Sequence, residues 1–120
     1  RVLLADDHAV LREGLVRILL QDASFSVVGE APDGETAVEL AAKLKPDVVL
    51  MDVMMPGIGG AEATRLIKET NPDMQVIALS MYDESERGAE MRAAGATDYI
   101  TKSQAAFTVA HAIRSCVKDQ

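Results

Sequence analysis

Aromatic side chains are scarce in this chain, which has two tyrosines, two phenylalanines and no tryptophan among 120 residues. Hydrophobic residues nevertheless make up 48% of the sequence. The chain should therefore fold around an aliphatic core and should not remain disordered. Its length corresponds to a single domain.

Cysteine and long apolar segments are also lacking. The single Cys116 excludes a disulfide within the chain. It falls in the last predicted helix, where a buried, unreactive thiol is expected. No apolar run approaches the roughly 20 residues of a membrane helix, and no signal peptide is recognisable. We therefore predict a cytoplasmic protein without a membrane partner.

The chain has fewer basic than acidic residues, with 12 Lys and Arg against 19 Asp and Glu. Its net charge is therefore −7. Such a surface repels phosphate backbones, so this segment should bind nucleic acid poorly by itself. The sequence opens directly on a strand-like run and ends in a polar segment. We interpret residues 1–120 as one domain cut from a longer protein.

Apolar runs typical of strands alternate five times with segments of helical periodicity. The predicted strands span residues 2–5, 26–31, 47–52, 75–79 and 97–101. The predicted helices span residues 9–20, 35–44, 61–70, 83–94 and 104–117. Pro46 should end the second helix, and Gly95 should cap the fourth in a left-handed conformation. The third and fourth strands are apolar without alternation, as expected of strands buried on both faces. Short connections favour parallel crossovers, which predicts a three-layer α/β/α sandwich.

Polar residues follow four of these strands at the point where each ends: Asp6 and Asp7, Asp52, Ser80 and Lys102. In an open parallel sheet the carboxyl ends of the strands line one crevice, and ligands bind there. One crevice should therefore hold three carboxylates, a hydroxyl and an ammonium group.

The acidic residues suggest a site for a hard cation. Neighbouring strand residues point to opposite faces, so Asp6 and Asp7 can address one site only if the strand has just ended. One of them could simply cap the following helix. Asp52 adds a third carboxylate, however, and three acidic groups in one crevice repel one another. Mg²⁺ would relieve this repulsion, because it prefers oxygen ligands.

Asp52 is the best candidate nucleophile, because a carboxylate can attack phosphorus to form an aspartyl phosphate. Transfer of a phosphoryl group depends mainly on positioning and charge neutralisation. Lys102 would supply a positive charge for a phosphoryl oxygen, and Ser80 a hydrogen bond. Taken singly, Lys102 could be an ordinary paired surface lysine, and Ser80 could simply begin a turn.

The chain resembles a two-component response-regulator receiver domain along its whole length. The segments that carry the resemblance are residues 4–8, 49–57, 78–80, 93–96 and 99–102. Residues 6–15, 28–31 and 79–83 are similar to the subfamily whose receivers precede a helix-turn-helix DNA-binding domain. The fold class we predict is accordingly flavodoxin-like and doubly wound, with five helices and a five-stranded parallel sheet in the order 2-1-3-4-5.

The resemblance implies that Asp52 receives the phosphoryl group from a sensor histidine kinase. It also implies that Asp7, Asp52 and the backbone carbonyl of Met54 bind Mg²⁺ or Mn²⁺. Asp6 would reach the ion mainly through water. The domain would catalyse its own phosphorylation and dephosphorylation without being a metabolic enzyme.

The resemblance further implies that Ser80 and Lys102 contact the phosphoryl group and that Tyr99 is a switch residue. Tyr99 would move inward when Ser80 is drawn to the phosphate. From the residues alone, Tyr99 would be a half-buried strand tyrosine whose hydroxyl finds any partner. Phosphorylation would change the surface formed by the fourth helix and fifth strand.

Three positions depart from the pattern of many receivers, and the role of His8 is open. Ser103 replaces a proline that takes a cis peptide bond after the lysine, and a cis bond without proline costs about 3 kcal/mol. Gly59 replaces an aspartate that would cap the third helix. Met81 replaces a small residue and would narrow access to Asp52. His8 could bind a metal, but beside hard oxygen ligands an ordinary loop histidine is the expected role.

Three other functions are conceivable for a chain with these residues. A Mg²⁺-dependent phosphohydrolase would carry a second acid two residues after the nucleophile, where this chain has Met54. A flavin carrier on the same fold would need a different loop after the first strand. A receiver-like interaction module that is not phosphorylated would lack one of the acids. As the parent protein we expect a transcription regulator that binds DNA through an absent C-terminal domain, with a hybrid sensor kinase as the alternative. Phosphorylation could also drive formation of a homodimer.

Overall fold

The computed structural model of the chain describes residues 1–80, 86–102 and 104–118. Its strands are β1 (Val2–Ala5), β2 (Val27–Ala31), β3 (Val48–Asp52), β4 (Gln75–Ser80) and β5 (Asp98–Thr101). Its helices are α1 (Ala9–Leu20), α2 (Gly34–Leu44), α3 (Gly59–Thr70), α4 (Glu86–Ala94) and α5 (Ala105–Lys118). Within these ranges no helix combines the length and the apolar composition that crossing a membrane requires.

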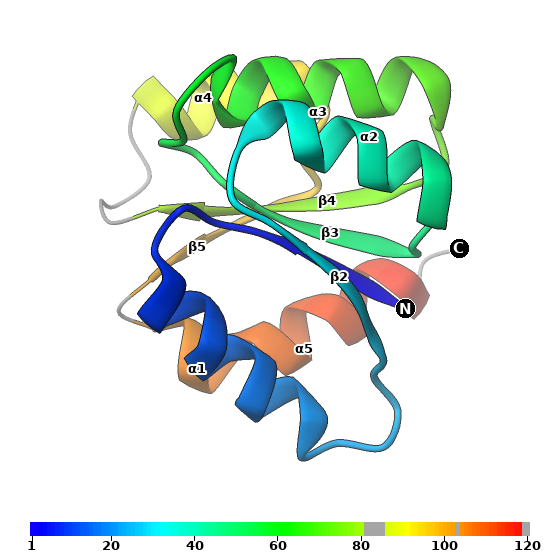
Figure 1. The fold of residues 1–120 in the computed structure, drawn as a ribbon, viewed down its shortest axis with the longest axis vertical. Coiled ribbons are helices and arrows are strands. Elements are labelled where there is room, and N and C mark those ends of the chain that lie inside the picture. Colours follow the sequence, from blue (N-terminus) through cyan, green and yellow to red (C-terminus); the bar gives the residue numbers. More distant parts are fainter. Residues whose placement is uncertain (81–85, 103, 119–120) are drawn as a thin grey trace.

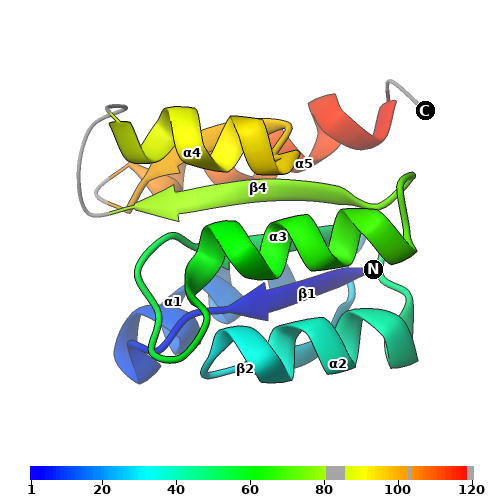
Figure 2. The same ribbon diagram turned by 90° about the horizontal axis from the view of Figure 1, so that it is seen from above.

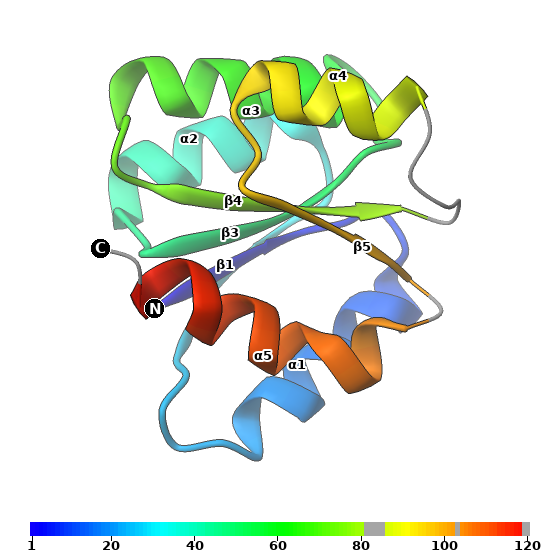
Figure 3. The same cartoon turned by 180° about the vertical axis from the view of Figure 1, so that it is seen from behind.

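The strands form one parallel sheet in the order β2-β1-β3-β4-β5. Helices α2, α3 and α4 cover one face, and α1 and α5 cover the other (Figure 1). Seen from above, β1 and β4 point the same way, with α3 lying along them (Figure 2). Seen from behind, β5 lies at the edge of the sheet beside β4 (Figure 3). The predicted flavodoxin-like three-layer sandwich is therefore confirmed.

Side chains of the central strands alternate between two aliphatic clusters, one on each face of the sheet. Leu3 and Val49 pack beneath α2 and α3, whereas Leu4 and Leu50 pack beneath α1 and α5. Both faces are covered by helices, which explains why these strands show no polar alternation in the sequence. Cys116 is buried in the second cluster, as expected of an unreactive thiol.

The ends of helices α2 and α4 are formed by local features that the sequence contains. The side chain of Asp33 caps α2 by accepting a hydrogen bond of 2.8 Å from the Thr36 amide. This bond holds the pKa of Asp33 below its ordinary value. Lys45, before Pro46, takes a left-handed conformation directly after α2. Gly95 follows α4 with φ of 117°, the left-handed cap that was predicted.

Helix α3 begins at Gly59, two residues before the predicted start, and no side chain caps it. The reason for the earlier start is the close approach of Gly60 to β3. The Gly60 amide donates to the Val53 carbonyl at 3.2 Å. A Cβ atom on Gly60 would lie 2.9 Å from Val53 Cα and would overlap the carbonyl oxygen of Asp52. Only glycine allows α3 to begin this close to the end of β3.

Replacing Gly60 by alanine should lower the free energy of unfolding by about 2 kcal/mol, because backbone atoms cannot yield to the added methyl group. Gly14 in α1 is the matched control, since nothing lies within 4 Å of its virtual Cβ. Gly14→Ala should raise stability by about 0.5–1 kcal/mol. Urea denaturation of both variants measures the difference. Equal effects at the two positions would contradict the close approach.

Candidate functional site

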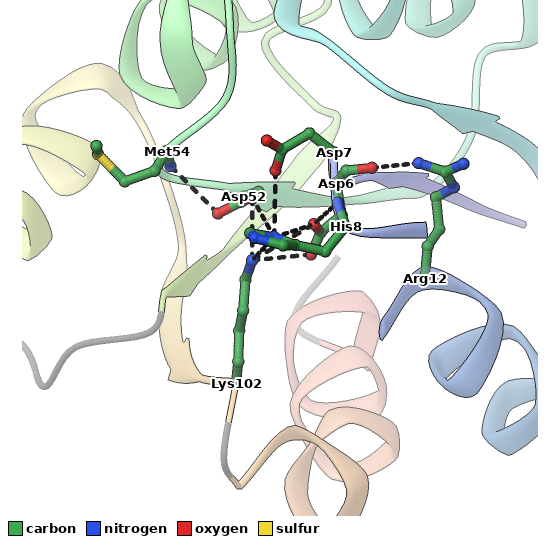
Figure 4. A network of polar contacts seen from close by, with 7 residues as sticks. All are labelled: Asp6, Asp7, His8, Arg12, Asp52, Met54 and Lys102. Atoms are coloured by element: carbon green, nitrogen blue, oxygen red, sulfur yellow. Dashed lines mark hydrogen bonds and ion pairs between the residues drawn. The ribbon is translucent and has the colours of Figure 1, made fainter. Parts of the chain in front are cut away.

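Strand alternation brings Asp6, Asp52 and Lys102 to the same side of the sheet. Leu4, Leu50 and Ile100 point toward α1 and α5. Asp6, Asp52 and Lys102 each come two residues later in the chain. Because side chains alternate with a period of two, these three residues lie on that same side, at the carboxyl ends of the strands. Figure 4 shows the three side chains converging from separate strands.

Lys102 pairs with two carboxylates inside the protein. Its Nζ atom lies 3.0 Å from Asp52 Oδ2 and 3.1 Å from Asp6 Oδ2. The exposed fractions of the Lys102, Asp52 and Asp6 side chains are 4%, 2% and 0%. Removing charges from water is costly unless they are paired. One cation against two anions still leaves this buried group with a net negative charge.

Asp7 and His8 complete the site at its solvent side. The Asp7 side chain is 34% exposed and that of His8 is 56% exposed. His8 Nδ1 lies 3.2 Å from Asp6 Oδ1, 3.2 Å from Asp7 Oδ1 and 3.1 Å from Lys102 Nζ. The sequence indicated an ordinary loop histidine, but the imidazole lies directly over the carboxylates. A histidine in the last loop position before a helix carries no signal for this contact.

Neither Asp6 nor Asp7 is the N-cap residue of helix α1. Its N-cap residue is His8, whose side chain makes no capping bond. Asp6 Oδ1 does accept a hydrogen bond of 2.8 Å from the His8 amide. The same carboxylate faces Lys102, so the simple capping alternative does not account for its position.

The loop after β3 holds Asp52 from the other side. The Met54 amide donates to Asp52 Oδ1 at 3.2 Å, and the Met54 side chain is about half exposed at the rim of the site. Burial raises the pKa of Asp52 to about 6, and the nearby negative charge of Asp6 adds to this effect. The hydrogen bond from Lys102 acts in the opposite direction.

The acidic cluster of Asp6, Asp7 and Asp52 fits a hard cation. Together with His8, each of these residues offers a ligand atom, and the four atoms lie within 4.8 Å of one another. The buried Asp6 Oδ2 atom lies 3.1 Å from the Lys102 ammonium group but makes no well-aligned hydrogen bond among the described residues. A carboxylate oxygen in this position is a suitable partner for a cation or its bound water.

Ser80 and Tyr99 lie on the opposite side of the sheet from Lys102. Ser80 is buried at the end of β4, and its carbonyl accepts a 2.6 Å bond from the Lys102 amide. Tyr99 is half-buried against the cluster beneath α3 and α4. It pairs with Ala78 in the sheet, which makes Ser80 its diagonal neighbour on the same face. Met81 and Ser103, for which the sequence suggested narrowed access and a doubtful cis bond, lie outside the described residues.

Sequence reasoning missed Arg12. Its guanidinium donates to the backbone carbonyl of Asp6 and, through Nε at 3.0 Å, to the Glu30 carboxylate on β2 (Figure 4 shows the first contact). In the sequence, Arg12 looks like any solvated arginine on the surface of a helix. Only the paired strands reveal that Glu30 lies next to it, because β1 and β2 place Leu4 opposite Glu30.

Comparisons with known proteins show which family the chain resembles. The family model for the response regulator receiver domain matches residues 2–114. Response regulator GacA of Pseudomonas viridiflava is 45% identical over 114 residues, which covers 95% of this chain and 53% of that protein. Transcriptional regulatory protein DegU of Brevibacillus brevis is 40% identical over 114 residues, which covers 95% of this chain and 48% of that protein. The chain thus spans about half the length of these curated relatives. The solved signal receiver domain of the response regulator NarL from Mycobacterium tuberculosis superposes with a TM-score of 0.94 at 35% identity, covering 100% of this chain and 97% of that one.

The raised pKa of Asp52 predicts how stability depends on pH in the absence of divalent cations. The unfolded chain ionises this carboxyl at about 3.8 and the folded chain at about 6. Its contribution to stability is therefore complete below pH 4 and is lost as the pH rises through 6. Relative to Asp52→Asn, the wild-type unfolding free energy should fall by an amount on the order of 2 kcal/mol between pH 4 and pH 7. Denaturation curves in EDTA test this, and parallel pH profiles for the two proteins would contradict it.

Proposed function

Since the chain belongs to the response regulator receiver domains, we propose that Asp52 accepts a phosphoryl group from a sensor histidine kinase and thereby switches an output. Receiver domains are modules of two-component signalling and not metabolic enzymes. The observation that carries the proposal is the buried contact between Asp52 and Lys102, with Asp6 and Asp7 beside it. No feature of the described residues favours the phosphohydrolase or the flavin carrier.

In the proposed reaction, the bond between phosphorus and a histidine nitrogen of the kinase breaks, and a bond between phosphorus and an Asp52 oxygen forms. Attack requires the carboxylate form, which predominates at neutral pH when the pKa is about 6. Lys102 already lies 3.0 Å from Asp52 Oδ2. Its ammonium group can therefore transfer its pairing from the carboxylate to a phosphoryl oxygen with little movement.

Mg²⁺ or Mn²⁺ would be held by Asp7, Asp52 and the backbone carbonyl of Met54, with Asp6 acting mainly through water. When bound, the cation would offset negative charge on the transferred group. The partly exposed Asp7 side chain lies at the open side of the cluster, where a hydrated ion can enter. The buried Asp6 Oδ2 atom pairs with the Lys102 charge but makes no well-aligned hydrogen bond among the described residues, which is compatible with a contact through bound water.

The switch would use Ser80 and Tyr99. Phosphorylation adds about 1.5 to 2 negative charges and three acceptor oxygens. Ser80 would turn toward this group, and Tyr99, its diagonal neighbour across β4 and β5, would fill the space on the α4 side. The surface of α4 and β5 would change as a result, which is how a charge at the site becomes a signal.

The output we propose is transcription. DegU, one of the relatives, is by name a transcriptional regulatory protein, and the relatives are about twice as long as this chain. Residues 1–120 would then be the receiver domain of a longer cytoplasmic regulator that binds DNA through a further domain and dimerises on phosphorylation. A receiver attached to a hybrid kinase and an interaction module that is not phosphorylated are the alternatives.

Phosphorylation is tested by incubating the domain with Mg²⁺ and a small acyl phosphate, followed by mass spectrometry of the intact protein. We expect one added phosphoryl group in the wild type and none in Asp52→Asn. Addition to both proteins would show that Asp52 is not the sole acceptor. If neither protein reacts, a histidine-kinase donor decides between hindered access and an interaction module.

Binding of Mg²⁺ is tested by thermal unfolding with and without the ion. At ten times its Kd, the ion should stabilise the wild type by about 1.4 kcal/mol, because it binds only the folded state. Asp7→Ala should abolish this gain. Glu39→Gln on the exposed side of α2 is the charge-matched control and should keep it. If Asp7→Ala still gains stability, Asp7 is not a ligand.

A further inference from the structure

The backbone turns sharply where β1 ends, and this turn is what brings two consecutive carboxylates to one site. Asp6 is fully buried and Asp7 is partly exposed, yet both offer oxygen atoms within the same 4.8 Å cluster. Consecutive residues of an extended strand would point to opposite faces. The orientation of the peptide unit between Asp6 and Asp7 therefore determines whether Asp7 faces the cation site.

Two contacts fix that part of the backbone. The Asp6 amide donates to the Ala31 carbonyl of β2 at 3.0 Å. On the other side, the Asp6 carbonyl, which belongs to the peptide unit shared with Asp7, accepts a hydrogen bond from the Arg12 guanidinium. Arg12 is itself held by its Nε bond of 3.0 Å to Glu30.

We propose that Arg12 is a positioning residue, held by Glu30, that orients the Asp6–Asp7 peptide so that the Asp7 carboxylate points into the cation site. This inference rests on the proposed function, because it assigns Arg12 a role in the cation site of that function. Arg12 does not touch the cation or the phosphoryl group. It acts on them only through the backbone that carries the acidic residues.

The Arg12–Glu30 pair differs from an ordinary surface ion pair, which contributes little to stability. The Arg12 side chain is only 19% exposed. Its planar guanidinium uses two separate N–H groups for two different acceptors, one of them a backbone carbonyl. This fork fixes a geometry that a single flexible ammonium group cannot reproduce. Residues that orient ligands in this indirect way commonly change metal affinity when they are removed.

Two possible roles of Arg12, as a nearby positive charge and as a positioning residue, predict opposite changes in the affinity for Mg²⁺. If Arg12 acted only as a positive charge near the site, its removal would tighten Mg²⁺ binding, because repulsion of the cation would fall. If Arg12 orients Asp7, its removal should weaken binding. Arg17, an exposed arginine on the same helix, is the matched control because Arg17→Ala removes the same charge without this contact.

The experiment measures the Mg²⁺ Kd of the folded domain by calorimetry, with the unfolding temperature in EDTA recorded separately. We expect Arg12→Ala to raise the Kd about tenfold, whereas Arg17→Ala leaves it unchanged or slightly lower. Glu30→Gln should raise the Kd in the wild-type background but not in the Arg12→Ala background, because Glu30 acts through Arg12. Glu39→Gln controls for the lost negative charge. Arg12→Lys keeps the charge without the fork and should recover only part of the affinity.

Two further readouts separate positioning from a general structural defect. In the metal-free protein, hydrogen exchange of the His8 amide, which donates to Asp6 Oδ1, should be faster in Arg12→Ala than in Arg17→Ala. Once Mg²⁺ saturates the variant, its rate of phosphorylation by a small donor should return to the wild-type rate.

An Arg12→Ala Kd equal to or below that of Arg17→Ala would overturn the proposal while leaving the proposed function intact. If Arg12→Ala does not fold, a Glu30→Gln Kd equal to that of Glu39→Gln would overturn it as well. If the wild type binds no Mg²⁺ and is not phosphorylated, the proposed function itself fails.

Discussion

The buried contact of Lys102 with Asp6 and Asp52 is the constraint on which the rest of this structure depends. Two carboxylates that are almost fully shielded from water would repel each other, and one ammonium group at 3.0 and 3.1 Å makes their burial possible. The compensation is incomplete, because the group keeps a net negative charge and the pKa of Asp52 is raised to about 6. That remaining negative charge is what a bound divalent cation would neutralise in the proposed site. The same imbalance of charge that raises the pKa of Asp52 therefore suits the proposed chemistry.

Most of the architecture was predictable, because its signals are local. The strand β1 and the helix α1 have the predicted bounds, and short connections between apolar runs predicted the parallel sheet. The strand order, which the family resemblance implied, is also confirmed. The errors were small and had physical causes. Ser26 and Asp47 were assigned to strands but lie just before them. Helix α3 begins two residues early because Gly60 packs against the backbone of Asp52, a contact between elements that no periodicity reveals.

The chemistry of the site was predictable as a set of residue types, but its geometry was not. Asp6, Asp52 and Lys102 were identified because each stands at the carboxyl end of a strand. Alternation of side chains then explains why they share one side of the sheet. Arg12 was not identified as part of the site, and His8 was considered as a metal ligand but was expected to be an ordinary loop histidine. Their contacts depend on the loop between β1 and α1 and on a pairing across 18 positions, from Arg12 to Glu30. Arginine in the first turns of a helix usually points into solvent, so composition could not distinguish this one.

Lys102 is 96 positions from Asp6, and it follows the edge strand β5. During synthesis from the amino terminus, both carboxylates therefore exist well before the residue that neutralises them. Strands β1 and β3 are central and can pair early, but their acidic ends stay mutually repulsive until β5 joins the sheet. The proposed phosphoryl-accepting site thus becomes complete only with the last strand. An unfinished chain would lack the ammonium group that the proposed reaction uses, so acceptance of a phosphoryl group would be tied to completion of the domain.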